Sequence, residues 1–181
     1  NQEHKLMILD YKNEFILNND SMDGSSGLRD YNDYNEWLDK LNNQLKEETT
    51  PKNLVPSTTL LAIRKSDNKM VGIIDIRHKL NNYLFNFGGH IGYSIRKSER
   101  RKGYAKEMLN LALAECKKLS IDKILITCDS KNIGSYKTIL GNNGVLENEK
   151  DCFCLGNRVG HLFCWRAGSG WHHYHQWQIG R

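Results

Sequence analysis

The sequence lacks a long hydrophobic run. No apolar stretch approaches the roughly 20 residues that a membrane-spanning helix needs, and the N-terminal residues Asn1–Lys5 show no secretory pattern. Prolines are scarce, since Pro51 and Pro56 are the only two, and there is no internal repeat. These absences argue against a membrane partner and a repeat protein, and we expect a soluble, cytoplasmic protein.

Paired cysteines are missing as well. The chain has five cysteines, an odd number whose spread favours reduced thiols over a disulfide framework. Cys152-x-Cys154, with His161 and Cys164, lacks the paired Cys-x-x-Cys units of a typical zinc site, so we predict no metal. Two further cysteines lie in helix-like and strand-like patterns, where burial is usual, and are not expected to be activated nucleophiles: Cys116 and Cys128.

The length and the hydrophobic content of the chain are enough for one domain. At 181 residues, 39% of them hydrophobic, the chain can bury a core of its own. We assign residues 1–150 to this domain. Residues 151–181 crowd Cys, Trp and His together without clear periodicity, which leaves three interpretations open: terminal strands, a tail swapped onto another subunit, or sequence foreign to the domain.

Helical and extended patterns alternate along the domain. Met108, Leu109 and Ala112, for example, recur at helical spacing. The expected helices are Glu3–Leu17, Tyr34–Lys46, Lys106–Leu119 and Ile133–Leu140. The expected strands are Thr58–Arg64, Met70–Arg77, His90–Ile95 and Ile121–Cys128. This order predicts a mixed α/β domain with a right-handed crossover between the last two strands.

The densest positive charge lies between the third strand and the third helix. From Arg96 to Lys106, six basic residues face one acid, Glu99, giving a local charge of +5 that equals the net charge of the whole chain. A strand, a basic turn with a glycine and a helix start place backbone N–H groups and the helix dipole around an anion. Because the charge is compact, a small polyanion such as a pyrophosphate fits better than nucleic acid.

Five motifs follow one another at compatible spacings: the strand Gly92–Ile95, the turn Arg100–Ala105, its helix, the strand Ile124–Cys128, and Asn132-x-x-Ser135. This order resembles the core of the GNAT superfamily of acyl-CoA-dependent N-acetyltransferases. The resemblance implies a mixed, mostly antiparallel central sheet with a V-shaped splay between two parallel strands, flanked by helices. It also implies acetyl-CoA as the donor substrate.

The resemblance assigns a cofactor site. Arg100, Gly103 and Ala105 match the family's phosphate-binding motif, so the backbone amides from Arg101 to Lys106 are expected to hold the pyrophosphate. Two side chains are expected near the ribose phosphate: Arg101 and Lys102. The full expected set is Tyr93, Ser94, Ile95, Arg100, Arg101, Lys102, Gly103, Tyr104, Ala105, Lys106, Asn132 and Ser135.

In the V, the resemblance implies that main-chain groups of Ser94 and Ile95 pair with the pantetheine arm, as an added strand would. The N–H near Ile95 is expected to polarise the thioester carbonyl. Many members carry a tyrosine that protonates the departing thiolate, but this chain has Ile139 there. Water, Tyr136 or Tyr104 are the remaining proton sources.

The amine must also lose a proton before it attacks, and no single base follows from the sequence. The candidates are Asp75, His78, His90 and Asp129. The predicted catalytic residues are thus Ile95, Asp75, His90 and Tyr136. Direct attack on the thioester, without an acyl-enzyme, is the mechanism that the resemblance implies.

Two loops outside the donor core are the acceptor-side candidates, Asp23–Gly27 and Tyr83–Gly89. We expect the acceptor to be a primary amine of a small molecule or a peptide. The alternative function is an acyl-CoA-binding or regulatory module that has lost turnover. A homodimer is the expected oligomer.

Overall fold

The computed structural model describes residues 4–152, 158–166 and 178–180. Its helices are α1 (Lys5–Leu17), α2 (Tyr34–Asn43), α3 (Tyr104–Lys118) and α4 (Ile133–Leu140). Its strands are β1 (Ser57–Arg64), β2 (Lys69–Arg77), β3 (Ile91–Ile95), β4 (Lys123–Asp129), β5 (Val145–Cys152), β6 (Arg158–Arg166) and β7 (Gln178–Gly180).

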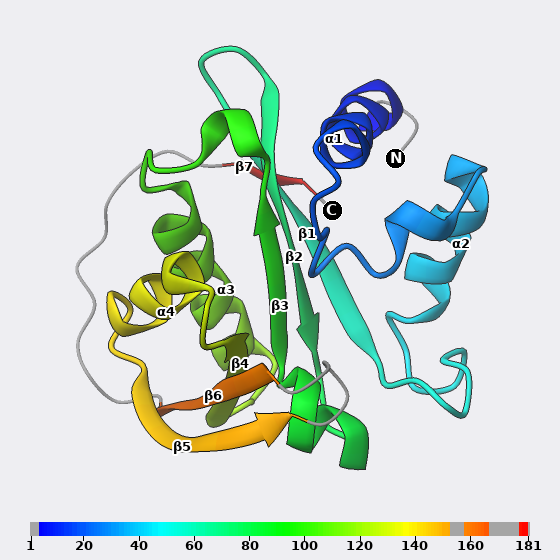
Figure 1. Ribbon diagram of the computed structural model, residues 1–181. Coiled ribbons are helices and arrows are strands. Elements are labelled where there is room, and N and C mark those ends of the chain that lie inside the picture. The colour runs from blue at the N-terminus through cyan, green and yellow to red at the C-terminus, as the bar shows by residue number, and fades with distance from the viewer. Residues whose placement is uncertain (1–3, 153–157, 167–177, 181) are drawn as a thin grey trace.

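These strands form two sheets, one ordered β3-β2-β1-β7 and the other β4-β6-β5. Every pairing within them is antiparallel. Helices cover both faces of the first sheet: α1 and α2 lie on one side, and α3 and α4 on the other (Figure 1). The predicted mixed α/β, mostly antiparallel architecture is therefore confirmed.

The alternation of side chains along β2 explains why two helical layers form. Ile73 packs with Tyr11, Trp37 and other residues beneath α1 and α2. Its neighbour Ile74 points the other way and packs with Leu109 and its neighbours beneath α3. Because both faces of β2 are apolar, the sheet has to be covered on both sides.

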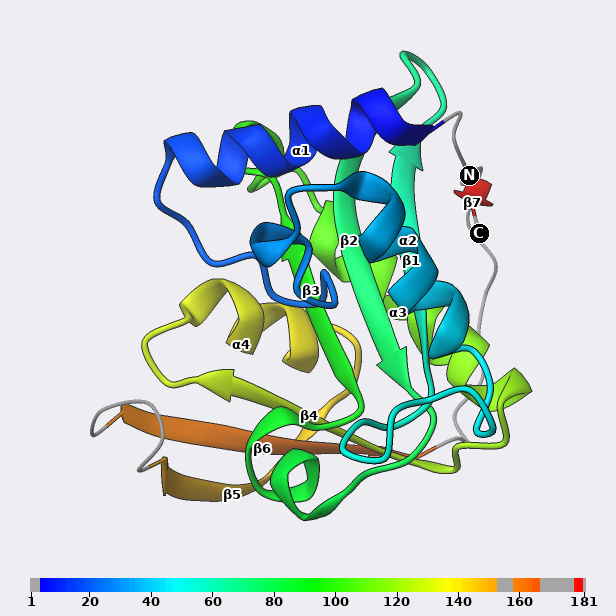
Figure 2. The ribbon, with the colours of Figure 1, turned by 90° about the vertical axis from the view of Figure 1, so that its right-hand side faces the viewer.

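The two sheets meet at one point and then separate. The His90 N–H donates to the Leu125 carbonyl at 2.7 Å, and the Leu125 N–H donates to His90 Nδ1 at 3.0 Å. Both contacts lie where β3 and β4 begin, and beyond them β4 runs away from β3 at a steep angle (Figure 2). The strands thus form the sides of a V whose closed end is the pair of His90 and Leu125.

All four predicted helices and all four predicted strands are present; Ile133–Leu140 has the predicted bounds, and the others have shifted ends. The third helix begins at Tyr104, two residues early, because Gly103 serves as its N-cap. The second ends at Asn43 rather than Lys46. The segment predicted as an aromatic loop contains a π-helical turn, η3 (Leu84–Gly88), whose preceding Tyr83 is exposed.

Terminal strands were one of the three interpretations of residues 151–181, but no bounds were predicted for them. β6 lies between β4 and β5 and pairs with both, and β5 runs across residue 150. The Cys and His set weighed as a metal site includes Cys154, which lies outside the described residues. In the described part of the chain, no group of three or more His, Cys, Asp or Glu residues could hold a metal ion, and no helix there is long and apolar enough to cross a membrane.

Candidate active site

The turn before α3 adopts a left-handed backbone at two positions, Arg101 with φ 65° and Gly103 with φ 88°. A Cβ on Gly103 would meet nothing within 4 Å, so its conformation, and not lack of space, is what favours glycine there. The Glu107 N–H donates to the Gly103 carbonyl at 3.2 Å and closes the first helical turn. The amides ahead of Glu107 have no intrahelical acceptor, and such a helix start favours an anion.

Three of the six basic side chains between Arg96 and Lys106 form ion pairs with acids. The buried guanidinium of Arg96 pairs with Glu14 at 2.6 Å and with Asp10 at 2.8 Å. The Ser98 N–H also donates to the Glu14 carboxylate, at 2.8 Å. These contacts fasten the chain between β3 and the turn to helix α1.

Glu99 forms ion pairs with three basic side chains. Its carboxylate, almost completely buried, pairs with Arg64 at 2.7 Å, Lys102 at 2.8 Å and Lys69 at 3.0 Å. The hydrogen bond from Arg64, followed by those from the two lysines, holds the pKa of Glu99 well below its usual range. The Lys102 ammonium, which the sequence analysis placed near the ribose phosphate, is thus engaged by Glu99.

Arg100 ties the turn to two other elements. Its Nε donates to the Ile95 carbonyl at 2.8 Å, and its Nη2 lies 2.7 Å from Asp20 Oδ2. The guanidinium also lies over the ring of Phe15, 5.8 Å from its centroid. In the described part of the chain no ion pair holds Lys97, Arg101 or Lys106, so three of the six basic residues keep an uncompensated charge.

The register of β3 decides which main-chain groups face the V. The Arg77 N–H donates to the His90 carbonyl, and the Arg96 N–H donates to the Val71 carbonyl. Since an antiparallel ladder alternates with period two, Ser94 bonds across to β2, whereas Tyr93 and Ile95 direct their main chains toward β4. The Ile95 N–H, the predicted oxyanion donor, therefore points into the V.

Ser94 is engaged on the opposite face of the sheet. The buried hydroxyl of Tyr11 donates to the Ser94 carbonyl at 2.9 Å and lies 3.0 Å from its Oγ. This contact couples α1 to the strand that borders the V. It gives Ser94 a positioning role that its sequence context did not indicate.

A polar cluster spans the V on the side of α4. The hydroxyl of Tyr93 lies 2.9 Å from Ser135 Oγ, and the side chain of Asn132 caps α4 by accepting from the Ser135 N–H at 3.0 Å. Burial raises the pKa of Tyr93 to about 12 and that of Cys128 to about 11. Both groups keep their protons at neutral pH, so Cys128 is not an activated nucleophile.

The candidate bases have different positions and hydrogen-bond partners in the structure. Asp75 is buried, and its Oδ1 accepts from Thr59 Oγ1 at 2.9 Å and from Ser26 Oγ at 3.2 Å. His90 lies at the closed end of the V, where burial, with the nearby charge of Arg77, lowers its pKa. His78 Nε2 lies 2.8 Å from Thr58 Oγ1.

Two positions on and before α4 complete the candidate set. Asp129 Oδ1 accepts from the Lys131 N–H at 2.8 Å. Tyr136 is half-buried against the α3 core. The side chain of Ile139, at the position of the family's tyrosine, is buried in that core.

Both acceptor-side loops approach the V. Gly24, with φ 73°, leaves so little room that an added Cβ would lie 2.1 Å from the Gly92 carbonyl oxygen. The Asp23–Gly27 loop therefore rests directly on β3. The η3 segment reaches the other strand, because Thr127 Oγ1 donates to the Phe87 carbonyl at 2.9 Å.

A helix start that favours an anion, beside a sheet that splays into a V, is the architecture of a coenzyme-dependent acyltransferase. The family model described as acetyltransferase (GNAT) domain matches residues 11–144. The chain therefore belongs to the GNAT family of acetyltransferases, as its motifs predicted. The family implies acyl-CoA-dependent acetyl transfer with acetyl-CoA as the donor.

Solved structures share the fold. The chain is similar to a GNAT acetyltransferase from Bacillus anthracis, with 24% identity and a TM-score of 0.51 over 60% of this chain and 65% of that one. A ribosomal-protein alanine acetyltransferase from Vibrio fischeri matches with 18% identity and a TM-score of 0.52 over 61% of each chain. A mutant spermidine N-acetyltransferase from Vibrio cholerae matches with 15% identity and a TM-score of 0.55 over 75% and 76%.

At these identities the likeness shows the fold alone. The chain spans less than two thirds of the length of the first two of these structures. A search of curated protein sequences finds no match.

Proposed function

We propose that this protein is an N-acetyltransferase that moves an acetyl group from acetyl-CoA to a primary amine by direct attack. The observation that carries the proposal is the left-handed turn at Gly103, which opens α3 beside the V. An anion site lined by amides thus adjoins a slot that suits an extended pantetheine arm.

The turn and the slot divide the coenzyme between them. The amides from Arg101 to Lys106 bind the diphosphate, and the Arg100 side chain positions them through the Ile95 carbonyl. The arm lies in the V, where main-chain groups of Tyr93 and Ile95 face it. This arrangement brings the thioester carbonyl to the Ile95 N–H.

The acceptor enters from the opposite face of the sheet. The Asp23–Gly27 loop rests on β3 there, and Ser26 links it to the buried Asp75. Asp23 adds a carboxylate that attracts a cationic amine. An amine acceptor is also what the similar spermidine N-acetyltransferase is named for.

In the chemical step, the amine nitrogen forms a bond to the carbonyl carbon and the carbon–sulfur bond then breaks. The Ile95 N–H stabilises the oxyanion between these events. Before attack the amine must lose a proton, for which Asp75, under the acceptor loop, is the proposed acceptor through water. The thiolate needs a donor, and two phenols lie near α4, those of Tyr136 and Tyr93.

Two measurements test this function. Isothermal titration with acetyl-CoA reports binding, and a free-thiol assay across a panel of polyamines, amino acids, aminoglycosides and peptides reports turnover. Binding together with thiol release that depends on an amine is the expected result. Absence of acetyl-CoA binding would falsify the proposal.

A second candidate function is an acyl-CoA-binding module without turnover. The burial of Ile139, at the position where many family members carry the tyrosine, favours it. Tight binding with no thiol release for any amine of the panel would support this function over the first.

A further inference from the structure

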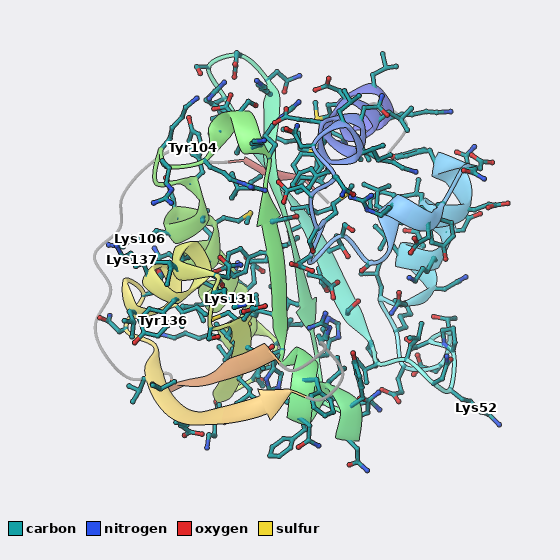
Figure 3. All side chains as sticks on the ribbon, in the orientation of Figure 1. Lys52, Tyr104, Lys106, Lys131, Tyr136 and Lys137 are labelled. Carbon is teal, nitrogen blue, oxygen red and sulfur yellow. The ribbon has the colours of Figure 1, made fainter. Side chains whose placement is uncertain are left out.

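Two exposed lysines lie where α4 ends against α3. The buried amide of Asn142 donates to the Lys106 carbonyl at 3.1 Å and to the Thr138 carbonyl at 2.9 Å. The Gly141 N–H donates to the Lys137 carbonyl at 2.9 Å, and a Cβ on Gly141 would lie 3.4 Å from Lys106 Cε. The Lys106 stem therefore passes the last turn of α4, and Figure 3 places Lys106 and Lys137 at one edge of the molecule.

No carboxylate in the described part of the chain forms an ion pair with either lysine. Three of the basic residues between Arg96 and Lys106 differ, since Arg96, Arg100 and Lys102 have acidic partners. Two like charges at one junction repel each other when no counterion is present. A pair of unpaired cations of this kind raises the local concentration of anions.

The position of Lys106 indicates which anion the two lysines attract. Lys106 follows Gly103 by three residues, about 4.5 Å along the helix axis at 1.5 Å per residue. Lys106 therefore lies in the first turn of α3, whose amides are proposed to bind the diphosphate. Besides that diphosphate, coenzyme A carries a phosphomonoester on its ribose, and such a group bears about −1.5 to −2 charges at pH 7.

We infer that Lys106 and Lys137 form a phosphomonoester site that binds the ribose 3′-phosphate of coenzyme A. The chain thereby selects the 3′-phosphorylated coenzyme over its dephospho form. This inference rests on the proposed function. Lys102 is a poorer ligand because Glu99 holds its ammonium, whereas two mobile ammonium groups suit a dianion at an exposed site.

The test compares two probes, coenzyme A and 3′-dephospho-coenzyme A, by isothermal titration. The variants are Lys106→Met, Lys137→Met and the double variant, because methionine keeps an apolar stem and removes the charge. The control is Lys52→Met, an exposed lysine on the opposite side of the molecule (Figure 3).

Wild type is expected to prefer coenzyme A by roughly tenfold at low salt, as two exposed charge pairs allow. Each single variant loses about threefold in affinity for coenzyme A and nothing for the dephospho form. The double variant binds both probes within about twofold, and Lys52→Met behaves as wild type. Raising the salt concentration reduces the preference in wild type and has no effect on it in the double variant.

Equal binding of the two probes by wild type overturns the inference while leaving the proposed function standing. An equal loss of affinity for both probes in the lysine variants also overturns the inference, because it would show that the lysines do not act on the 3′-phosphate. Failure of wild type to bind either probe overturns the proposed function, and this site with it. Circular dichroism melts of every variant distinguish a binding loss from unfolding.

Discussion

The guanidinium of Arg100 lies 2.7 Å from the carboxylate of Asp20, although Asp20 follows α1 on one face of the sheet and Arg100 precedes α3 on the other. Asp20 precedes the Asp23–Gly27 loop, and Arg100 opens the turn before α3. The pair thus joins the proposed acceptor loop to the proposed diphosphate site. Both side chains are partly exposed, so the ion pair itself contributes little stability, about 1 kcal/mol at most.

Replacing Asp20 separates positioning from stability. We expect Asp20→Asn to weaken acetyl-CoA binding about three- to fivefold, because Arg100 loses one of the contacts that fix the turn. The free energy of unfolding should change by less than about 1 kcal/mol. Titration calorimetry and urea denaturation give the two quantities.

The control for Asp20 is Asp39→Asn, which removes an exposed carboxylate of α2 far from the turn. Its affinity for acetyl-CoA should equal that of wild type. An Asp20→Asn protein that binds acetyl-CoA as wild type does would contradict the positioning role.

Gly103→Ala tests the left-handed turn. An alanine at φ 88° costs about 1 to 2 kcal/mol even though its Cβ has open space around it. We expect a comparable loss of stability and a loss of acetyl-CoA affinity of tenfold or more, since the amides of the turn are displaced. The dissociation constant from titration and the midpoint of urea denaturation check both effects.

Gly27 supplies the matched control for that substitution. It has φ 78°, and an added Cβ would meet its nearest atom, Lys40 Nζ, at an ordinary contact distance of 3.5 Å, but it lies in the acceptor loop. Gly27→Ala should therefore destabilise the fold to a similar degree while keeping acetyl-CoA affinity within about twofold. Equal affinity losses in the two variants would show that strain anywhere in the fold suffices.

His90 makes the closed end of the V sensitive to acid. Its Nδ1 accepts from the Leu125 N–H, and burial lowers its pKa in the folded protein. Unfolded chains take up the proton near the ordinary pKa of about 6.5, whereas the folded protein resists it. The stabilisation is therefore complete above about pH 6.5 and declines as the pH falls below that value.

Urea denaturation between pH 5 and 8 measures this dependence. His90→Gln should reduce the slope of unfolding free energy against pH below about pH 6.5, by at most 1.36 kcal/mol per pH unit for one proton. Part of the slope remains, because burial also lowers the pKa of His78. A slope unchanged by His90→Gln would show that this imidazole does not take part.

Phenylalanine substitutions distinguish the two phenols near α4. We expect Tyr93→Phe to lower kcat about tenfold with the KM for acetyl-CoA within twofold, because a hydrogen bond to a charged thiolate contributes about 1.5 to 3 kcal/mol. Tyr136→Phe should lower kcat less than threefold, since only Tyr93 extends from the strand whose main chain faces the V.

Ser135→Ala is the companion variant for Tyr93, because it removes the partner hydroxyl and leaves the phenol. It should retain most of the wild-type kcat. The reverse ranking, with Tyr136→Phe the slower enzyme, would assign the thiolate donor to α4.

Local patterns were enough to predict the helix, the strands and the basic turn that make up the proposed donor site. The helical spacing of Met108, Leu109 and Ala112 located α3, although its start was predicted at Lys106 and lies at Tyr104. The sequence could not show that Glu99 neutralises Lys102, because that contact depends on Arg64 and Lys69, which are remote in the chain. The same holds for Tyr93 and Ser135, which only the angle between β3 and β4 brings together.

The bounds of the strands after residue 144 could not be predicted for a different reason. Among the described residues β5 pairs with β6 alone, and its charged segment Glu147–Asp151 lacks the apolar alternation by which a half-buried strand is recognised. β7 is only three residues long. Neither carries a periodic signal that outweighs its polar composition.

The position of β6 between β4 and β5 determines when the second sheet can form during synthesis. Since β4 has no hydrogen-bonded strand partner other than β6 in the described part of the chain, one wall of the V stays an open edge until residues 158–166 arrive. A nascent chain on the ribosome must therefore expose that edge for some time. Competence to bind the coenzyme is expected only after residues 158–166 have been made and have paired with β4, and not when the turn before α3 forms.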